Sequence, residues 1–246
     1  MDVKNKEFWE KKEVINTQNI SKTPYNYEKY LFKEATSRLN KVRNFEAANI
    51  YGCGTGRDIK VIEEHFKPKL IVASDISENM IEGCKENLKG WNIKSNVQLH
   101  VADASKLKVD SDKFDLVTLL NSMLTYVPKR KNRLRIFQNS YDSLIERGVV
   151  IGVVHNQIGR PMKTYYFRLR KLFSFLLKDK VGNKSTGFKG YKLPGYYYDK
   201  KWLKKDLAHA GFKNISIMSL EEFFQNTGRA YDKSKSYNQL IFICNK

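Results

Sequence analysis

The sequence predicts an α/β fold built on a doubly wound, mostly parallel sheet, and three observations support this. A short apolar run at residues 47–51 leads into the glycine turn Gly52-Cys53-Gly54-Thr55-Gly56. Residues 58–66 carry apolar side chains at helical spacing, and residues 70–73 form a β-branched run typical of a strand buried on both faces. Asp75 ends that run, 19 residues after Gly56. A strand, a turn, a helix and a second strand in this order indicate parallel pairing.

The length and composition fit one α/β domain with room for an insertion. The chain has 246 residues, of which 41% are hydrophobic. No apolar run approaches the ~20 residues that a membrane span needs, and the first residues contain no apolar signal region. The three cysteines match neither a metal-ligand spacing nor a disulfide framework, so we expect no metal site. We therefore expect a cytoplasmic protein.

The net charge of +19 comes from 45 Lys and Arg residues against 26 Asp and Glu residues. A positive charge of this size attracts phosphate-rich partners, anionic lipid or acidic substrates. The lysines are spread along the whole chain, however, and the sequence is generally rich in Lys, Asn and Ile. A bias of composition is the favoured interpretation, and a nucleic-acid partner remains the alternative.

The remaining elements follow from periodicity and from turn signals. A helix is expected over residues 25–39, after a break at Thr23-Pro24, and another from an N-cap at Ser77 to about residue 88. Strands are expected at residues 96–101, 113–121 and 149–154, with a loop at 122–128 and a helix at 131–145. A late helix at 199–212 ends at Gly211, and strands at 215–218 and 239–244 close the chain.

Residues 157–197 have a different character from the alternating elements around them. Residues 163–178 predict one amphipathic helix, with basic side chains away from its apolar side, and residues 182–195 predict a loop rich in glycine and lysine. The predicted apolar side comprises Tyr165, Leu169, Leu172, Phe173, Leu176 and Leu177. Such a helix suits a cap over a pocket, and a membrane surface or a phosphate-rich partner are the alternatives.

The spacing G-x-G-x-G, followed by Asp75-Ile76, resembles motif I and the next motif of the class I S-adenosylmethionine (SAM)-dependent methyltransferases. The resemblance runs from about residue 47 to about residue 154 and resumes weakly near residue 198. It implies a Rossmann-like, seven-stranded sheet whose last hairpin is antiparallel. It also implies one methyltransferase domain over residues 1–246, with an N-terminal helical segment at 1–45 and a cap insertion at 157–197.

The resemblance also implies the cofactor, SAM, and the residues that hold it. Gly52, Gly54 and Gly56 leave room for its methionine and ribose, and Asp75 with Ile76 faces the ribose. Asp103 and Ala104 stand where the family binds adenine, and Asn121 ends the strand that borders the methionine. Many members have an acid two residues before the first motif glycine, where this chain has Ile50. Asn49 and Asp58 are candidates to compensate for that missing acid.

Motifs that are missing from the sequence also exclude some classes of methyl acceptor. Residues 121–124, Asn-Ser-Met-Leu, lack the Asp/Asn-Pro-Pro-aromatic motif of enzymes that methylate base amines, and no cysteine lies where a nucleophile is needed. We expect transfer to an oxygen or nitrogen of a small molecule, with His155 or Tyr126 as general base. Tyr25, Tyr30 and Tyr165 are candidate substrate contacts. An RNA methyltransferase of the cap-guanine type and a non-catalytic SAM-binding subunit are the alternatives, and the oligomeric state stays open.

Overall fold

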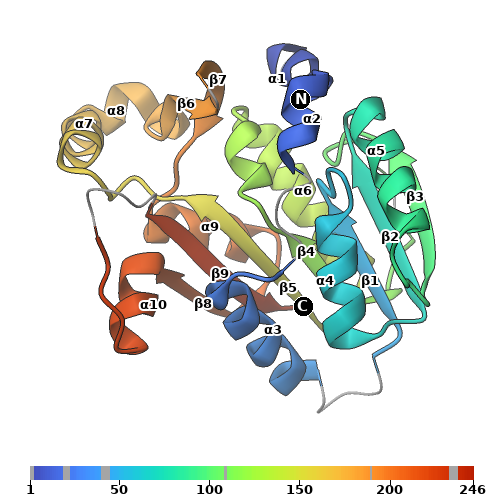
Figure 1. The fold of residues 1–246 in the computed structure, drawn as a ribbon. Coiled ribbons are helices and arrows are strands. Elements are labelled where there is room, and N and C mark those ends of the chain that lie inside the picture. Colours follow the sequence, from blue (N-terminus) through green and yellow to red (C-terminus); the bar gives the residue numbers. More distant parts are fainter. Residues whose placement is uncertain (1–2, 19–22, 40–44, 108–109, 189, 233–237) are drawn as a thin grey trace.

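The computed structural model describes residues 3–18, 23–39, 45–107, 110–188, 190–232 and 238–246. Its centre is a seven-stranded sheet in the order β3-β2-β1-β4-β5-β9-β8 (Figure 1). Strands β1 to β5 pair in parallel, whereas β9 is antiparallel to both β5 and β8. The expected doubly wound sheet with an antiparallel last hairpin is confirmed.

The parallel strands have the bounds β1 Ala47–Tyr51, β2 Leu70–Asp75, β3 Asn96–Val101, β4 Phe114–Leu119 and β5 Leu144–His155. The antiparallel edge consists of β8 Lys213–Ser219 and β9 Gln239–Asn245. Strands β1 and β4 are buried along their whole length, as continuous apolar runs covered on both faces should be. Strand β5 begins five residues before the predicted start at residue 149.

Helices cover both faces of the sheet. The helices α3 Asn26–Leu39, α4 Arg57–Phe66, α5 Glu78–Lys89 and α10 Leu220–Asn226 pack into one hydrophobic core cluster. The helices α6 Arg130–Ser143 and α9 Lys200–His209 pack into the other. Ser77 caps α5 by accepting a hydrogen bond from the Met80 backbone at 3.0 Å, and Gly211 follows α9 with φ of 100°, both as predicted.

The N-terminal segment contains two short helices before α3, α1 Val3–Trp9 and α2 Lys12–Gln18. They lie above the carboxyl ends of the parallel strands (Figure 1). The side chain of Asn5 is fully buried and donates to the carbonyl of Tyr126 at 2.6 Å and to that of Pro194 at 3.1 Å. On the other side, the Glu10 carboxylate accepts from the backbone N–H groups of Glu78 and Asn79 at the start of α5.

The insertion differs from the sequence prediction in two respects. The predicted single helix is divided at Phe173 into α7 Pro161–Leu172 and α8 Ser174–Leu177, which the short helix η2 Lys178–Lys180 follows. The predicted loop is wrong, because β6 Asn183–Phe188 and β7 Tyr191–Tyr196 form an antiparallel hairpin. The glycines and lysines of this segment have little strand propensity, and for this reason the sequence suggested a loop. Pairing of the two strands stabilises the hairpin instead. Helix α10 was not assigned from the sequence.

Gly152, in the middle of β5, gives a test of the core packing. A β-carbon at this position would lie 2.3 Å from the Phe242 ring of the neighbouring strand β9. We expect Gly152→Ala to lower the free energy of unfolding by about 1–3 kcal/mol, because the ring cannot move within a close-packed core. Urea denaturation measures this, with Gly90→Ala as control, since a β-carbon there meets nothing closer than 3.7 Å. An equal effect of the two variants would contradict the packing described here.

Candidate functional site

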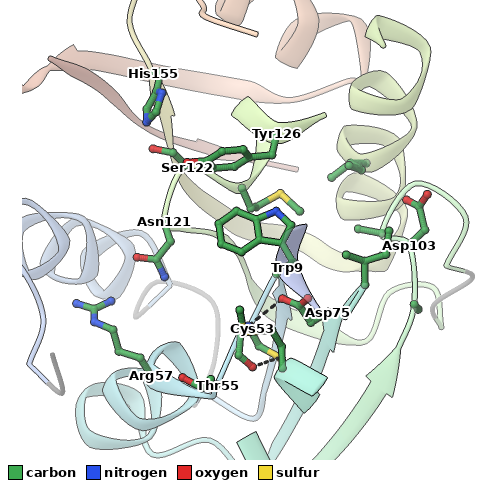
Figure 2. A pocket seen from close by; sticks show the side chains of 18 of the residues that line it. Trp9, Cys53, Thr55, Arg57, Asp75, Asp103, Asn121, Ser122, Tyr126 and His155 are labelled. Carbon is green, nitrogen blue, oxygen red and sulfur yellow. Dashed lines mark hydrogen bonds between the residues drawn. The ribbon is translucent and has the colours of Figure 1, made fainter. Parts of the chain in front are cut away.

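One cavity of about 570 Å³ opens at the carboxyl ends of the parallel strands, where ligands of open α/β sheets bind. The glycine turn, β2, the loops after β3 and β4, and the N-terminal segment all contribute to it (Figure 2). Its lining includes Trp9, Tyr25, Gly52, Gly54, Arg57, Asp75, Ile76, Asp103, Ala104, Asn121, Ser122, Tyr126, His155 and Gln239. Sequence positions more than 200 residues apart therefore meet around a single space.

The glycine turn forms the floor of the cavity. Gly52, Gly54 and Gly56 have φ values of 70°, 53° and 96°, a region that side chains with a β-carbon disfavour. A β-carbon on Gly54 would meet nothing within 4 Å, so this glycine leaves space open on the cavity side. A β-carbon on Gly56 would lie 2.7 Å from the Cys84 sulfur, and Gly56 does not line the cavity. Gly54 therefore leaves room for a ligand, whereas Gly56 lets α4 pack against α5.

Asp75 lies at the end of β2 beside the glycine turn. Its two carboxylate oxygens accept hydrogen bonds from the backbone N–H groups of Gly54 at 2.9 Å and Ser77 at 3.0 Å. Burial raises the pKa of this carboxyl, and the N–H groups of Ser77 and Gly54 act in the opposite direction. Each oxygen keeps a further lone pair, and Asp75 and Ile76 both line the cavity.

The far end of the cavity is bordered by Asp103 and Ala104, after β3. The Asp103 Oδ1 accepts from the backbone N–H of Ser105 at 2.9 Å and from its hydroxyl at 2.8 Å. This turn holds the carboxylate at the cavity edge, and Met80 and Ile136 provide apolar walls nearby. The loop is held from below, because the Asn139 amide donates to the Ala104 carbonyl at 2.9 Å.

A buried charge cluster lies beside the near end of the cavity. The Arg57 guanidinium binds the Glu28 carboxylate at 2.6 and 3.0 Å and Asp58 Oδ1 at 2.9 Å. Asp58 in turn accepts from the Asn121 amide nitrogen at 2.9 and 3.0 Å. Two carboxylates therefore share one guanidinium. Burial, followed by the charge of Glu28, raises the pKa of Asp58 to about 7.

Ile50 stands where many class I methyltransferases carry an acid, and Asp58 was a candidate to compensate for it. The Ile50 side chain is fully buried in the hydrophobic core and offers no polar group. Asp58 is fully buried one layer behind Asn121, which is exposed to the cavity. Because Asp58 takes both hydrogen bonds through the Asn121 nitrogen, the carbonyl oxygen of that amide stays available as an acceptor. Asn121 and Ser122 have φ values of 52° and 56°, a strained turn of the kind that functional sites retain.

Tyr126 and His155 border the opposite side of the cavity from the charge cluster (Figure 2). Their ring centroids lie 6.3 Å apart. Burial, with a smaller contribution from the Lys163 charge, lowers the pKa of His155 to about 4. The buried Arg133 holds the loop after Tyr126 by donating to the carbonyls of Val127 at 2.8 Å and Pro128 at 2.7 Å. His155 is thus a neutral imidazole at physiological pH, beside a fixed tyrosine.

Trp9 is a cavity residue to which the sequence analysis assigned no role. Its indole ring packs edge-to-face on Tyr126 with centroids 5.1 Å apart (Figure 2). Glu28 was missed as well. Neither position is marked by a local motif, because each reaches the site only through the folding of the N-terminal helices over the sheet edge.

The three candidate substrate tyrosines lie in different surroundings. Tyr25 lines the cavity and stacks on Tyr27 with ring centroids 5.4 Å apart. Tyr30 packs against Phe223 of α10 instead, and does not line the cavity. Tyr165 lies on the outer side of α7 with 66% of its surface exposed, also outside the cavity lining. The placement of Tyr30 and Tyr165 therefore gives their predicted role no support.

Comparison with known proteins agrees with this geometry. A family model described as a methyltransferase domain matches residues 50–148. The carboxy-S-adenosyl-L-methionine synthase of Shewanella sediminis is 31% identical over 108 residues, which are 42% of this chain and 43% of that protein. The chain thus spans less than half the length of this curated relative.

Two solved structures show the shared fold. A SAM-dependent methyltransferase from Clostridium acetobutylicum has a TM-score of 0.61 at 17% identity, over 91% of this chain and 92% of that one. The phosphoethanolamine N-methyltransferase 2 of Haemonchus contortus, solved with SAM, has a TM-score of 0.64 at 14% identity, over 100% of this chain and 60% of that one. The chain therefore contains a segment, residues 50–148, that matches a methyltransferase domain, and its fold is shared with these SAM-dependent methyltransferases.

Proposed function

We propose that this protein transfers the methyl group of SAM to an oxygen or nitrogen of a small-molecule acceptor. The observation that carries the proposal is the order of groups along one cavity. Asp103 lies toward one end, Asp75 in the middle and Asn121 toward the other end (Figure 2), and Ala104 and Gly54 also line the cavity. Tyr126 and His155 border the side of the cavity away from Arg57 and are not needed for these cofactor contacts (Figure 2).

The residues present fit SAM in two respects. The open space over Gly54 would be filled by a β-carbon, so the backbone can approach a ligand closely there. When Asp58 is ionised, the carboxylates of Glu28 and Asp58 exceed the charge of Arg57 and leave a buried surplus of negative charge behind Asn121. SAM carries a cationic sulfonium and a cationic amino group. A cation at this end of the cavity would offset that surplus.

When bound, SAM supplies an electrophilic methyl group for an in-line displacement. The chain's contribution is to hold the donor and the acceptor close together and aligned, which can lower the barrier by several kcal/mol. Asp75 would hold the ribose hydroxyls, Asp103 and the backbone of Ala104 the adenine, and the Asn121 carbonyl the amino group. Trp9, Tyr126 and the N-terminal helices would keep water out of the space beside the methyl group.

The acceptor would bind in the cavity beside Tyr126 and His155. A neutral imidazole can take a proton from a hydroxyl or an ammonium group, and the low pKa of His155 keeps it in that form. The β6–β7 hairpin contributes Gly187 to the cavity lining, whereas α7 and α8 contribute no lining residue. The proposed cap is therefore the hairpin together with α1, which contributes Trp9.

Product analysis tests the proposal directly. The protein is incubated with SAM and a protein-free extract of small molecules, and mass spectrometry follows the fate of the SAM. Formation of S-adenosylhomocysteine together with a new methylated product would support methyl transfer. A heavier derivative of SAM would instead indicate a SAM-modifying reaction of the type named in the Shewanella relative. SAM binding without conversion would favour a non-catalytic subunit.

Asp75→Ala tests the cofactor site. We expect it to weaken SAM binding by about 1–3 kcal/mol, because charge-assisted hydrogen bonds to the ribose are lost. Calorimetric titration with SAM measures this, and Asp75→Asn is the control because it keeps one acceptor oxygen for the Gly54 turn. Unchanged affinity in a folded Asp75→Ala protein would remove Asp75 from the site.

The raised pKa of Asp58 leads us to expect that the stability of the fold depends on pH. Its folded pKa is raised from an ordinary value of 3.8 to about 7, so its stabilising contribution is full below 3.8 and is lost as pH rises through about 7. Relative to Asp58→Asn, the wild type should lose on the order of 4 kcal/mol over this range. Urea denaturation at several pH values measures the difference. Parallel pH profiles of the two proteins would contradict it.

SAM affinity should follow the same titration with the opposite sign. As pH rises through about 7, Asp58 ionises, and the added negative charge favours the cationic ligand. Titrations with SAM at pH values on either side of this pKa should show tighter binding at the higher pH in the wild type and a flat profile in Asp58→Asn.

His155→Gln separates catalysis from cofactor binding. We expect SAM affinity to stay within about 0.5 kcal/mol of wild type, since the imidazole lies beyond the cofactor groups. Methyl transfer to the acceptor should fall by about 100-fold or more, because the proton acceptor is lost. In the wild type, transfer should decline as pH falls through about 4. Full transfer by His155→Gln would exclude the imidazole as base.

A further inference from the structure

The outer side of α7 and α8 carries a large apolar surface. Its members are Met162, Tyr165, Leu169, Leu172, Phe173, Phe175 and Leu176, each between 45% and 81% exposed. We call these seven residues the α7–α8 face. Scattered exposed hydrophobic residues are ordinary, whereas seven within 15 residues of sequence on adjoining helices mark an interaction surface.

The outward direction of this face is determined by contacts on the inner side of α7. Phe167 is 2% exposed, and its ring lies 5.4 Å from that of Tyr197. The Arg170 guanidinium donates to the carbonyls of Lys180 at 2.6 Å and Val181 at 2.9 Å, which ties the end of α7 to the segment after α8. The α7–α8 face therefore cannot turn inward without breaking these contacts, and α7 and α8 project beyond the sheet (Figure 1).

The segment that carries the face is basic, although Arg170 and Lys163 lie on the inner side of α7. Residues 160–180 contain seven basic side chains, Arg160, Lys163, Arg168, Arg170, Lys171, Lys178 and Lys180, and a single acid, Asp179. Only Lys171 has an ion pair among the described residues of this stretch, with Asp199 at 2.7 Å. Arg168 and Lys178 are exposed. The combination of exposed aromatic and aliphatic side chains with unpaired basic ones is typical of helices that lie in a membrane interface.

We propose that the α7–α8 face binds the surface of an anionic lipid bilayer. The apolar side chains enter the boundary between headgroups and acyl chains, and the basic side chains bind lipid phosphates. Anionic lipid attracts each basic residue near the surface, and burial of apolar side chains adds to that attraction. This inference concerns a surface outside the cavity and does not depend on the proposed methyl transfer.

Charge argues against a second copy of the chain as the occupant. Two such faces brought together would oppose a net charge of six from residues 160–180 of each copy, and the whole chain carries +19. Like charges placed opposite one another at an interface cost binding energy, whereas an anionic bilayer complements them. Among the described residues, no helix is long and apolar enough to cross a membrane, so the proposed contact is with the surface.

Vesicle flotation with the full chain tests the proposal. We expect the protein to float with vesicles of phosphatidylcholine and phosphatidylglycerol, to remain unbound with phosphatidylcholine alone, and to dissociate at high salt. Phe175→Ser with Leu176→Ser should weaken binding by about tenfold or more, because two apolar anchors are lost. Arg168→Gln with Lys178→Gln should weaken it by a similar factor.

Matched controls separate the face from the overall charge. Lys85→Gln with Lys89→Gln removes two exposed charges from α5, and Val101→Ser removes a 50% exposed apolar side chain from β3. Both controls should bind vesicles as the wild type does, and all variants should keep the wild-type SAM affinity. A loss of binding in the controls equal to that in the α7–α8 variants would overturn the proposal, as would the absence of vesicle binding.

Light scattering supplies an independent outcome. If the wild type is a dimer without lipid, and Phe175→Ser with Leu176→Ser makes it a monomer, the face is an interface between copies and the proposal is wrong. Competition with RNA of equal phosphate content is a further test. If the RNA displaces both the wild type and the charge controls from vesicles, the proposal is wrong, because the protein then recognises phosphate rather than a bilayer. A monomer that binds anionic vesicles through this face supports the proposal.

Discussion

The site depends on the buried Arg57 guanidinium and the two carboxylates that it joins. Arg57 joins Glu28 of α3 to Asp58 of α4, and Asp58 in turn accepts from Asn121 in the turn after β4, so the cluster connects three parts of the chain. Buried ion pairs are seldom favourable in themselves, because desolvation offsets attraction. Here the arrangement leaves a surplus negative charge once Asp58 is ionised, and it sets the direction of the Asn121 amide. The cluster therefore positions a binding group and prepares its surroundings for a cation.

The sheet and the glycine turn could be predicted because their signals are local. Buried strands such as Ile71 to Ala73 read as continuous apolar runs, and a turn with positive φ at three positions requires glycine. The roles of Trp9 and Glu28 could not be predicted. Glu28 meets Arg57 across 29 residues and Trp9 meets Tyr126 across more than 100, so only tertiary structure brings them together. Asp58 was a candidate to compensate for the missing acid, but its position could not be predicted, because the sequence does not show that α4 places it behind Asn121.

In the insertion, the sequence pattern predicted the helix but not its surroundings. Apolar spacing on residues 163–178 predicted the sidedness of the helix, but spacing does not state whether that side meets protein or solvent. Phe167, which was not counted on the apolar side, is the buried anchor of α7. The β6–β7 hairpin was missed for a related reason, since its strands are stabilised by pairing with each other and by contact with the N-terminal helices rather than by propensity.

The N-terminal helices have a consequence for the rate at which ligands exchange. Asn5 holds α1 to the Tyr126 loop and to the hairpin, Glu10 holds the following turn to the start of α5, and Trp9 lies between these attachments inside the cavity. These few polar contacts hold Trp9 in place over the cavity. Opening these contacts requires neither the sheet nor the hydrophobic core to move. Local opening of α1 and α2 would therefore widen access to the cavity without disturbing the fold, so ligand exchange would depend on the least stable part of the chain around the site.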